Sequence, residues 1–183
     1  MKEKLILASK SPRRKQILTL ADIEFDIIAE DTPETYPEDL PISQIPIHIA
    51  MQKALQIKLK YPSRKILAAD TIVVLGHEII GKPKDKADAM RLLGKLSGQT
   101  HQVITGVVIL EGEETHSFAE MTTVTFNRLT PTQMEYYIDR CKPYDKAGAY
   151  AIQEWIGAVA IQKIEGCFYN VMGLPISRII PFL

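Results

Sequence analysis

Apolar and polar residues alternate along the chain in blocks that predict strands and helices in turn. Residues 5–8 form a short apolar run, which is typical of a buried strand. The pair Ser11–Pro12 then supplies a helix-capping residue and a first-turn proline, so we expect a helix over residues 12–21. Its apolar face would consist of Ile17, Leu18, Leu20 and Ala21. A second strand is expected over residues 25–29, and the apolar spacing over residues 45–59 predicts a long helix.

The middle of the chain predicts a β-hairpin. Residues 66–75 are almost continuously apolar, and Gly76–His77 turns the chain toward a short strand at residues 78–80. Asp85 is expected to cap a helix that ends at Ser97–Gly98. The further elements expected are strands over residues 103–110, 115–126 and 158–164, a helix opened by the capping box Thr130–Gln133, and a terminal helix after Pro175. Interleaved helices, strands and hairpins indicate an α/β fold with a mixed, twisted sheet and flanking helices.

The composition narrows the class of protein. Of the 183 residues, 46% are hydrophobic and 24% are charged, and at about 150 residues per domain this length predicts one domain over residues 1–183. Lys plus Arg and Asp plus Glu both number 22, and this zero net charge argues against a nucleic-acid partner. Cys141 and Cys167 are too few for a disulfide framework, which favours the cytoplasm. No apolar run reaches the ~18 residues that predict a membrane span.

The first candidate for chemistry is the segment Ser9–Arg14, at the junction of the first strand and the first helix. Unpaired backbone N–H groups and the positive end of the helix dipole make such a junction an anion site. Lys10, Arg13 and Arg14 lie where that dipole disfavours cations, and a bound triphosphate would offset the repulsion. The alternative is that these are solvated surface side chains of the first turn.

Two titratable residues lie in or beside predicted strands. Asp70 is the strongest single candidate, because a carboxylate inside an apolar strand predicts a metal, a cation or a catalytic purpose. A structural ion pair within the sheet is the alternative. His101 is better explained as a hydrogen-bonded strand-edge residue than as a base, and the four histidines have no zinc-ligand spacing.

Two loops could add contacts to a nucleotide. Gly76–Lys82 fits the first seven positions of a P-loop, but Pro83 stands where that loop needs Ser or Thr, so we reject a P-loop. Lys82 could still reach a phosphate, or it could be a surface lysine. In Asp145–Gln153, small residues surround two charges and an amide that could read a base edge. A glycine-mediated turn with a solvated Gln153 explains the same residues.

Six motifs occur in order across nearly the whole chain. They are Ser9-x-Ser11-Pro12-Arg13-Arg14, Ala69-Asp70-Thr71, Gly81-Lys82-Pro83, Leu96-Ser97-Gly98-x-x-His101-x-Val103, Asp145-Lys146-Ala147-Gly148-Ala149-Tyr150 and Gly173-Leu174-Pro175. Together they resemble the Maf family of nucleoside triphosphate pyrophosphatases. The resemblance implies an inosine triphosphatase-like α/β fold with two lobes around a deep cleft, usually as a homodimer. It also implies hydrolysis of nucleoside triphosphates to the monophosphate and pyrophosphate with Mg²⁺ or Mn²⁺, a housecleaning role, and in some members a link to cell-division arrest.

The resemblance also assigns roles to residues. Asp70 is expected to accept a proton from the attacking water and, with Glu34 as a second carboxylate, to hold the divalent cation. The substrate-binding side chains would be Ser9, Arg13, Arg14, Lys53, Thr71, Lys82, Lys146 and Gln153. Among them, Arg13, Thr71 and Gln153 fall on the family positions tied to substrate choice.

The segment Ala149-Tyr150-Ala151-Ile152-Gln153 is similar to the branch of the family that acts on dTTP and UTP, so these are the expected substrates. Two residues depart from the family's pattern. Glu154 stands where glycine is usual and could repel phosphates or narrow the base pocket, and Cys167 stands where Asp or Ser is common.

Two other classes of function are alternatives to the enzyme. A non-catalytic nucleotide-binding regulator of cell division would use the same cations and amide, but the carboxylates Glu34 and Asp70 favour the enzyme. A nucleic-acid-binding module predicts a basic excess and exposed aromatic side chains, and the zero net charge with one Trp argues against it.

Overall fold

Helices and strands alternate along most of the chain in the computed structural model, which describes residues 4–183. Within that range the strands are Leu5–Leu7 (β1), Phe25–Ile27 (β2), Ile66–Leu75 (β3), Glu78–Ile80 (β4), Thr100–Glu111 (β5), Glu114–Phe126 (β6) and Ile161–Glu165 (β7). The α-helices are Pro12–Leu20 (α1), Ile45–Lys58 (α2), Lys86–Leu96 (α3), Pro131–Cys141 (α4), Trp155–Ala160 (α5), Phe168–Met172 (α6) and Ile176–Ile179 (α7). Short 3-10 helices occupy Ile42–Gln44 (η1), Ala147–Ala149 (η2) and Ile180–Phe182 (η3).

The strands form one mixed sheet. Its order is β2-β1-β3-β5-β6-β7, and β4 pairs with β3 outside this path. β1 runs parallel to both of its neighbours, so that Ile6 lies opposite Asp26 on β2 and Ile66 on β3. β4 is antiparallel to β3, and β7 is antiparallel to β6. The predicted α/β fold with a mixed sheet, flanking helices and a hairpin at β3–β4 is therefore confirmed.

The chain divides into two compact units. Unit 1 consists of Met1–Thr71, Thr105–Glu120 and Gly173–Leu183, and unit 2 consists of Ile72–Ile104 and Met121–Met172. β3, β5 and β6 each contribute one part to unit 1 and the other to unit 2. The predicted single domain and the implied cleft stay predictions.

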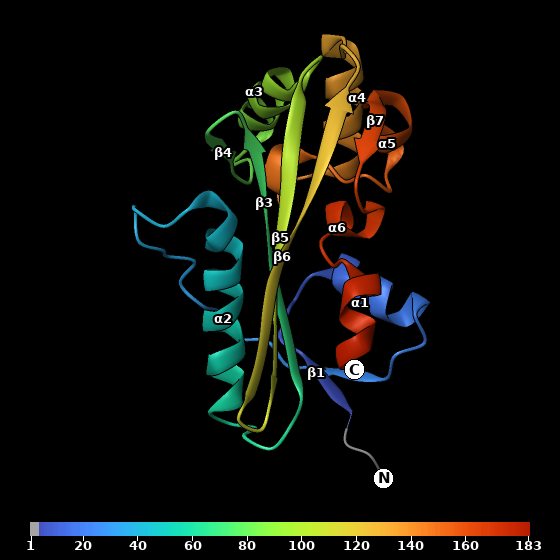
Figure 1. The fold of residues 1–183 in the computed structure, drawn as a ribbon. Helices are drawn as coiled ribbons and strands as arrows, with labels where there is room; N and C mark the ends of the chain where they lie inside the picture. Colours follow the sequence, from blue (N-terminus) through green and yellow to red (C-terminus); the bar gives the residue numbers. More distant parts are fainter. Residues whose placement is uncertain (1–3) are drawn as a thin grey trace. The chain divides into compact units, whose positions relative to one another are not determined.

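In unit 1, α2 covers one face of the strands (Figure 1). Its buried residues Ala50, Ala54 and Ile57 recur at helical spacing and pack with Ile66 and Ala68 of β3. Figure 1 shows α1 and the C-terminal end of the chain on the other side of β1. This arrangement gives β3 one face toward α2 and one toward α1, which decides where its side chains point.

In unit 2, α3 and α4 share one hydrophobic cluster. It contains Leu92, Leu93, Leu96, Met134, Tyr137 and Ile138. The helix starts follow the sequence prediction: Asp85 accepts a hydrogen bond from the N–H of Asp88 at 2.8 Å, and Thr130 and Gln133 form both bonds of the capping box. Among residues 4–183, no helix has both the length and the apolar character needed to cross a membrane.

The predicted strand over residues 158–164 is wrong in its first half. Trp155–Ala160 is helical, and the strand begins only at Ile161. Ile156 and Ala160, four residues apart, are both buried, which is the spacing of one helix face. A short apolar run does not distinguish a strand from a helix, so the sequence pattern was ambiguous here.

The apolar face predicted for α1 is also corrected. Ile17 and Leu18 are buried, but Leu20 is 65% exposed. At ~100° per residue, Arg14 projects between Ile17 and Leu18, whereas Leu20 projects outside that arc. The buried face of α1 is thus centred on a cation. Near the C-terminus, the predicted terminal helix is only the four residues of α7, and α6 had no sequence prediction.

Candidate functional site

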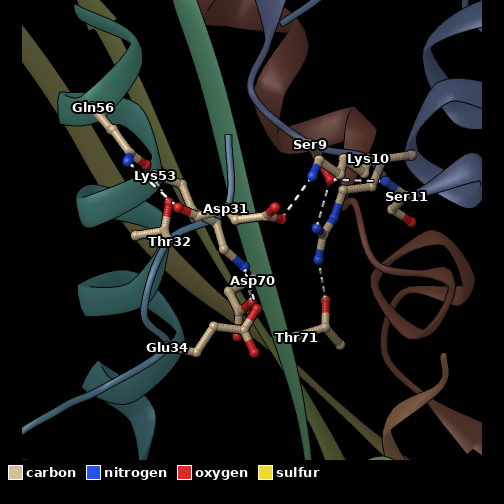
Figure 2. Close-up of polar contacts among 11 residues, drawn as sticks. Ser9, Lys10, Ser11, Asp31, Thr32, Glu34, Lys53, Gln56, Asp70 and Thr71 are labelled. Carbon is tan, nitrogen blue, oxygen red and sulfur yellow. Dashed lines mark hydrogen bonds and ion pairs between the residues drawn. The ribbon is translucent and has the colours of Figure 1, made fainter. Parts of the chain in front are cut away.

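Asp70 and Lys53 meet on the α2 face of unit 1. Side chains alternate along β3, so Asp70 shares the face of Ile66 and Ala68 that packs against α2. Asp70 is 8% exposed, and its Oδ1 accepts a hydrogen bond from Lys53 Nζ at 2.7 Å (Figure 2). The ion pair considered as an alternative is therefore present, and a further carboxylate joins it.

Glu34 reaches the same ammonium group from the loop after β2. Lys53 Nζ donates to Glu34 Oε1 at 2.8 Å. The loop lies along α2, where the hydroxyl of Thr32 and the side-chain oxygen of Gln56 are 2.5 Å apart, and Figure 2 shows both contacts on the same side of the helix. The side chain of Glu34 is 44% exposed, in contrast to the buried Asp70. The structure thus brings together the two carboxylates expected to hold a cation.

The donor set fits a divalent cation that is shared with a substrate. The described residues contain no cluster of three or more His, Cys, Asp or Glu side chains suited to a metal ion. Mg²⁺ is commonly bound by one or two carboxylates, with substrate phosphates and waters as the other ligands. Asp70 and Glu34 supply two such carboxylates, and their contact with one ammonium shows that positive charge is accommodated between them.

Arg14 organises the junction of β1 and α1. Its guanidinium donates from Nε to the carbonyl oxygen of Gly173 at 2.8 Å, from Nη1 to Ser9 Oγ at 3.0 Å and from Nη2 to Thr71 Oγ1 at 3.1 Å. Arg14 is 8% exposed, so the surface alternative does not hold for it. Burial lowers the pKa of the Arg14 guanidinium, and the negative charge of Asp70 opposes that shift.

Two hydroxyl groups link Arg14 to the backbone and to β5. Ser9 Oγ also accepts a hydrogen bond from the N–H of Ser11 at 3.2 Å, while the predicted capping bond from the Ser11 side chain is absent. Thr71 Oγ1 lies 2.9 Å from Thr105 Oγ1. Thr71 faces away from Asp70 because the two are consecutive on a strand, and Figure 2 shows them on opposite sides of β3. Arg13 is half-buried beside this network, in the first turn of α1.

The remaining predicted residues lie in unit 2. Lys82 is exposed after β4, and the N–H of Gly148 donates to the carbonyl oxygen of Gly81 at 3.0 Å, which joins the two predicted loops. Gly148 has φ +73°, and a Cβ there would lie 3.2 Å from the side chain of Val73. Glycine therefore lets this loop adopt a left-handed turn against the core. Lys146 is buried and Gln153 is exposed.

Three residues of these networks were not singled out as functional in the sequence. Thr105 lies inside an apolar strand, which is the same signal that identified Asp70. Gly173 contributes only a carbonyl oxygen, for which no side-chain signal exists. Tyr137 lies on the helix predicted after Thr130, and its hydroxyl bonds the 151–154 segment.

Comparisons with known proteins agree with this description. A family model described as Maf-like protein matches residues 4–183. The dTTP/UTP pyrophosphatase of Cytophaga hutchinsonii is 50% identical over 176 residues, which cover 96% of this chain and 81% of that protein. The dTTP/UTP pyrophosphatase of Porphyromonas gingivalis is 47% identical over 179 residues, which cover 96% of this chain and 90% of that protein.

A solved structure shares the fold at low sequence identity. The HAM1 protein from Coxiella burnetii has a TM-score of 0.51 and 16% identity, over 69% of this chain and 74% of that one. The family assignment rests instead on the match over residues 4–183 and on relatives that align with almost the whole chain. The chain belongs to the family of Maf-like proteins.

Proposed function

We propose that this protein hydrolyses nucleoside triphosphates, with UTP and dTTP as preferred substrates, to the nucleoside monophosphate and pyrophosphate. The observation that carries the proposal is the convergence of the carboxylates of Asp70 and Glu34 on the ammonium of Lys53. A buried carboxylate beside cationic side chains, together with a second and more exposed carboxylate, is suited to phosphoryl transfer. The name dTTP/UTP pyrophosphatase, borne by relatives 50% and 47% identical, supports the same reaction.

Asp70 is the general base of the proposed reaction. It accepts a proton from a water that attacks the α-phosphorus, the bond from that phosphorus to the bridging oxygen breaks, and pyrophosphate leaves. Lys53 holds the Asp70 carboxylate in place through the 2.7 Å hydrogen bond. General bases of this kind contribute roughly 10²–10⁴-fold in rate.

The cationic side chains neutralise the triphosphate. Phosphoryl transfer depends mainly on positioning and on stabilisation of charge, so several cations around one base are the expected arrangement. Arg14 uses three N–H groups on protein acceptors and keeps the others for a phosphate. The proposed phosphate-binding residues are Ser9, Arg13, Arg14, Lys53 and Lys82, and Lys146 is a further proposed substrate-binding residue. Arg13, Thr71 and Gln153 are the proposed determinants of substrate choice.

Asp70 and Glu34 would hold a divalent cation, Mg²⁺ or Mn²⁺, together with the phosphates. When bound, such a cation polarises the phosphoryl group and lowers the pKa of bound water. Since the two carboxylates are tied to α2 through Lys53, they are positioned before a substrate arrives. Their separation into one buried and one exposed group leaves Glu34 able to adjust to the ligand.

The experiment that tests the proposal measures products. With UTP or dTTP and Mg²⁺, the protein should release pyrophosphate and monophosphate in equal amounts, faster than with CTP, ATP or GTP, and EDTA should stop the release. Formation of orthophosphate and a diphosphate would overturn the proposed reaction. Tight nucleotide binding without any products would favour the non-catalytic regulator. The implied homodimer is checked by light scattering of the purified protein, and the cytoplasmic location by cell fractionation.

A further inference from the structure

Tyr137 holds both ends of the turn that carries Gln153. The turn Ala151–Glu154 is closed by a hydrogen bond from the N–H of Glu154 to the carbonyl oxygen of Ala151 at 3.1 Å. The hydroxyl of Tyr137 accepts a hydrogen bond from the N–H of Ala151 at 3.2 Å and donates one to Glu154 Oε2. Gln153 lies between these two anchored positions, and it is exposed.

Tyr137 is itself fixed by the core of unit 2. It is fully buried, and it packs with Met134 and Ile138 of the same helix in the cluster that also includes α3. A tyrosine hydroxyl has one proton to donate and lone pairs to accept, and both capacities are used in the turn. Burial raises the pKa of Tyr137, and its bond to Glu154 adds to that shift, so the hydroxyl remains a donor.

The charge of Glu154 is matched within unit 2. Its Oε1 lies 3.5 Å from Lys146 Nζ, which is also 2.8 Å from Asp145 Oδ1. The side chains of Lys146 and Glu154 are 9% and 25% exposed, respectively. The carboxylate of Glu154 is therefore directed toward a tyrosine and a lysine. These contacts argue against the role in repelling phosphates that the sequence suggested for Glu154. Glu154, which departs from the family's pattern, thus stabilises the turn.

We propose that Tyr137 and Glu154 are positioning residues that set nucleotide selectivity by fixing how Gln153 meets the pyrimidine base. The inference rests on the proposed function, in which Gln153 reads the base. An amide distinguishes bases only when its donor and acceptor are held in a defined orientation, because a mobile amide can rotate to match a different edge. Release of either end of the turn removes that constraint.

The first test removes one oxygen atom. Tyr137→Phe keeps the ring in the core but deletes both hydrogen bonds to the turn. We expect the preference for UTP over CTP, measured as a ratio of kcat/KM, to fall by about tenfold, which is the effect of one or two hydrogen bonds. The KM for UTP should rise while its kcat changes less than about threefold, because Asp70 and Lys53 are untouched. A purely structural role would lower the activity on both nucleotides alike.

Glu154 supplies an independent pair of variants. Glu154→Ala removes the acceptor of Tyr137 and should reduce the preference as Tyr137→Phe does, with no further loss in the double variant. Glu154→Gln keeps an oxygen for the Tyr137 hydroxyl and should retain the preference to within about threefold. If Tyr137→Phe does not fold, these two variants still decide the question. Equal preferences in Glu154→Ala and in the unsubstituted protein would overturn the inference.

The matched control is Tyr136→Phe. Tyr136 neighbours Tyr137 on α4, but it is 46% exposed, and its hydroxyl accepts from Arg140 at 2.6 Å instead of contacting the turn. Its ring packs on Trp155 and is retained in phenylalanine. We expect an unchanged preference. Should the unsubstituted protein release no pyrophosphate, the proposed function fails. The ratio of dissociation constants for UTP and CTP, measured with EDTA, then tests the positioning role alone, with the same changes expected.

Discussion

Lys53 Nζ lies 2.7 Å from Asp70 Oδ1, and the two side chains are only 16% and 12% exposed. A carboxylate in this position loses much of its hydration, and a direct hydrogen bond to an ammonium compensates for part of that loss. The same ammonium also binds Glu34, so it remains paired even when one carboxylate is altered. Activity and stability should therefore respond differently to substitutions at Asp70.

Asp70→Asn should reduce the activity far more than the stability. The amide keeps the size of the side chain and can still accept a hydrogen bond from Lys53, which stays paired with Glu34, so we expect the free energy of unfolding to fall by no more than about 1–3 kcal/mol. The loss of the base should reduce kcat for UTP by at least about 10²-fold. The control is Asp139→Asn, which alters an exposed carboxylate on α4 paired with Lys86. Turnover near that of the unsubstituted protein would remove Asp70 from the catalytic role.

Arg14→Lys tests whether the guanidinium geometry matters beyond its charge. Lysine cannot bond three acceptors that lie in the directions of Gly173, Ser9 and Thr71, so at least one buried acceptor loses its partner. We expect unfolding in urea to show a loss of about 1–3 kcal/mol, together with slower turnover. Arg91→Lys is the matched control, because Arg91 is 56% exposed and pairs with Asp88 on the same helix. Equal effects of the two substitutions would contradict the role assigned to Arg14.

Local signals in the sequence were sufficient for most of the fold. Ser11–Pro12, Asp85 and Thr130–Gln133 each mark a helix start by chemistry confined to one turn, and the structure has helices there. The helix at Trp155–Ala160 was mistaken for a strand because its few apolar residues fit both periods. The burial of one helix face decides that these residues are helical, and this burial depends on residues distant in the chain.

Some residues of the candidate site could likewise be recognised from local sequence, and others could not. Asp70 could be recognised because a carboxylate in an apolar strand is a local anomaly. Its contact with Lys53 follows from the alternation of side chains along β3, which turns residues 66, 68 and 70 toward α2. The buried position of Arg14 could not be foreseen, since its partners include a carbonyl oxygen 159 residues away. The turn at Gln153 likewise depends on a hydroxyl from α4 that only the tertiary fold brings near.

His101 should make stability depend on pH. Its ring is 1% exposed, with Nε2 2.8 Å from the hydroxyl of Tyr150, and burial lowers the pKa of His101 to about 4. The unfolded chain takes up the proton near pH 6.5 and the folded chain only near pH 4, so the free energy of unfolding falls as the pH falls through this window. The loss is up to about 3 kcal/mol. This outcome agrees with the view of His101 as a structural residue.

The measurement is urea unfolding between pH 4 and 7.5 for the unsubstituted protein and for His101→Gln. The difference in the free energy of unfolding between the two should shrink toward low pH. His77→Gln, in the exposed turn between β3 and β4, should follow the unsubstituted protein at every pH. A His101→Gln curve parallel to that of the unsubstituted protein would show that burial does not shift this histidine.

Gly106→Ala should displace the helix that carries Lys53. A Cβ at residue 106 of β5 would lie 2.2 Å from the backbone nitrogen of Ile47 and 2.3 Å from the carbonyl carbon of Pro46, at the start of α2. Backbone atoms cannot rotate away as a side chain can, so α2 must shift or the strand must bend. Overpacking of this kind costs about 1–3 kcal/mol. Because Lys53 lies two turns further along α2, turnover should fall as well as the melting temperature.

Gly94→Ala is the opposing control for this last substitution. Gly94 lies in α3, and nothing is within 4 Å of a Cβ built there. Alanine at a solvent-facing helix position stabilises by about 0.5–1 kcal/mol relative to glycine, so the melting temperature should rise while the rate of pyrophosphate release stays the same. The same substitution of glycine by alanine should therefore lower the melting temperature at residue 106 and raise it at residue 94. A Gly106→Ala protein as stable and as active as the unsubstituted one would show that α2 does not depend on its close approach to β5.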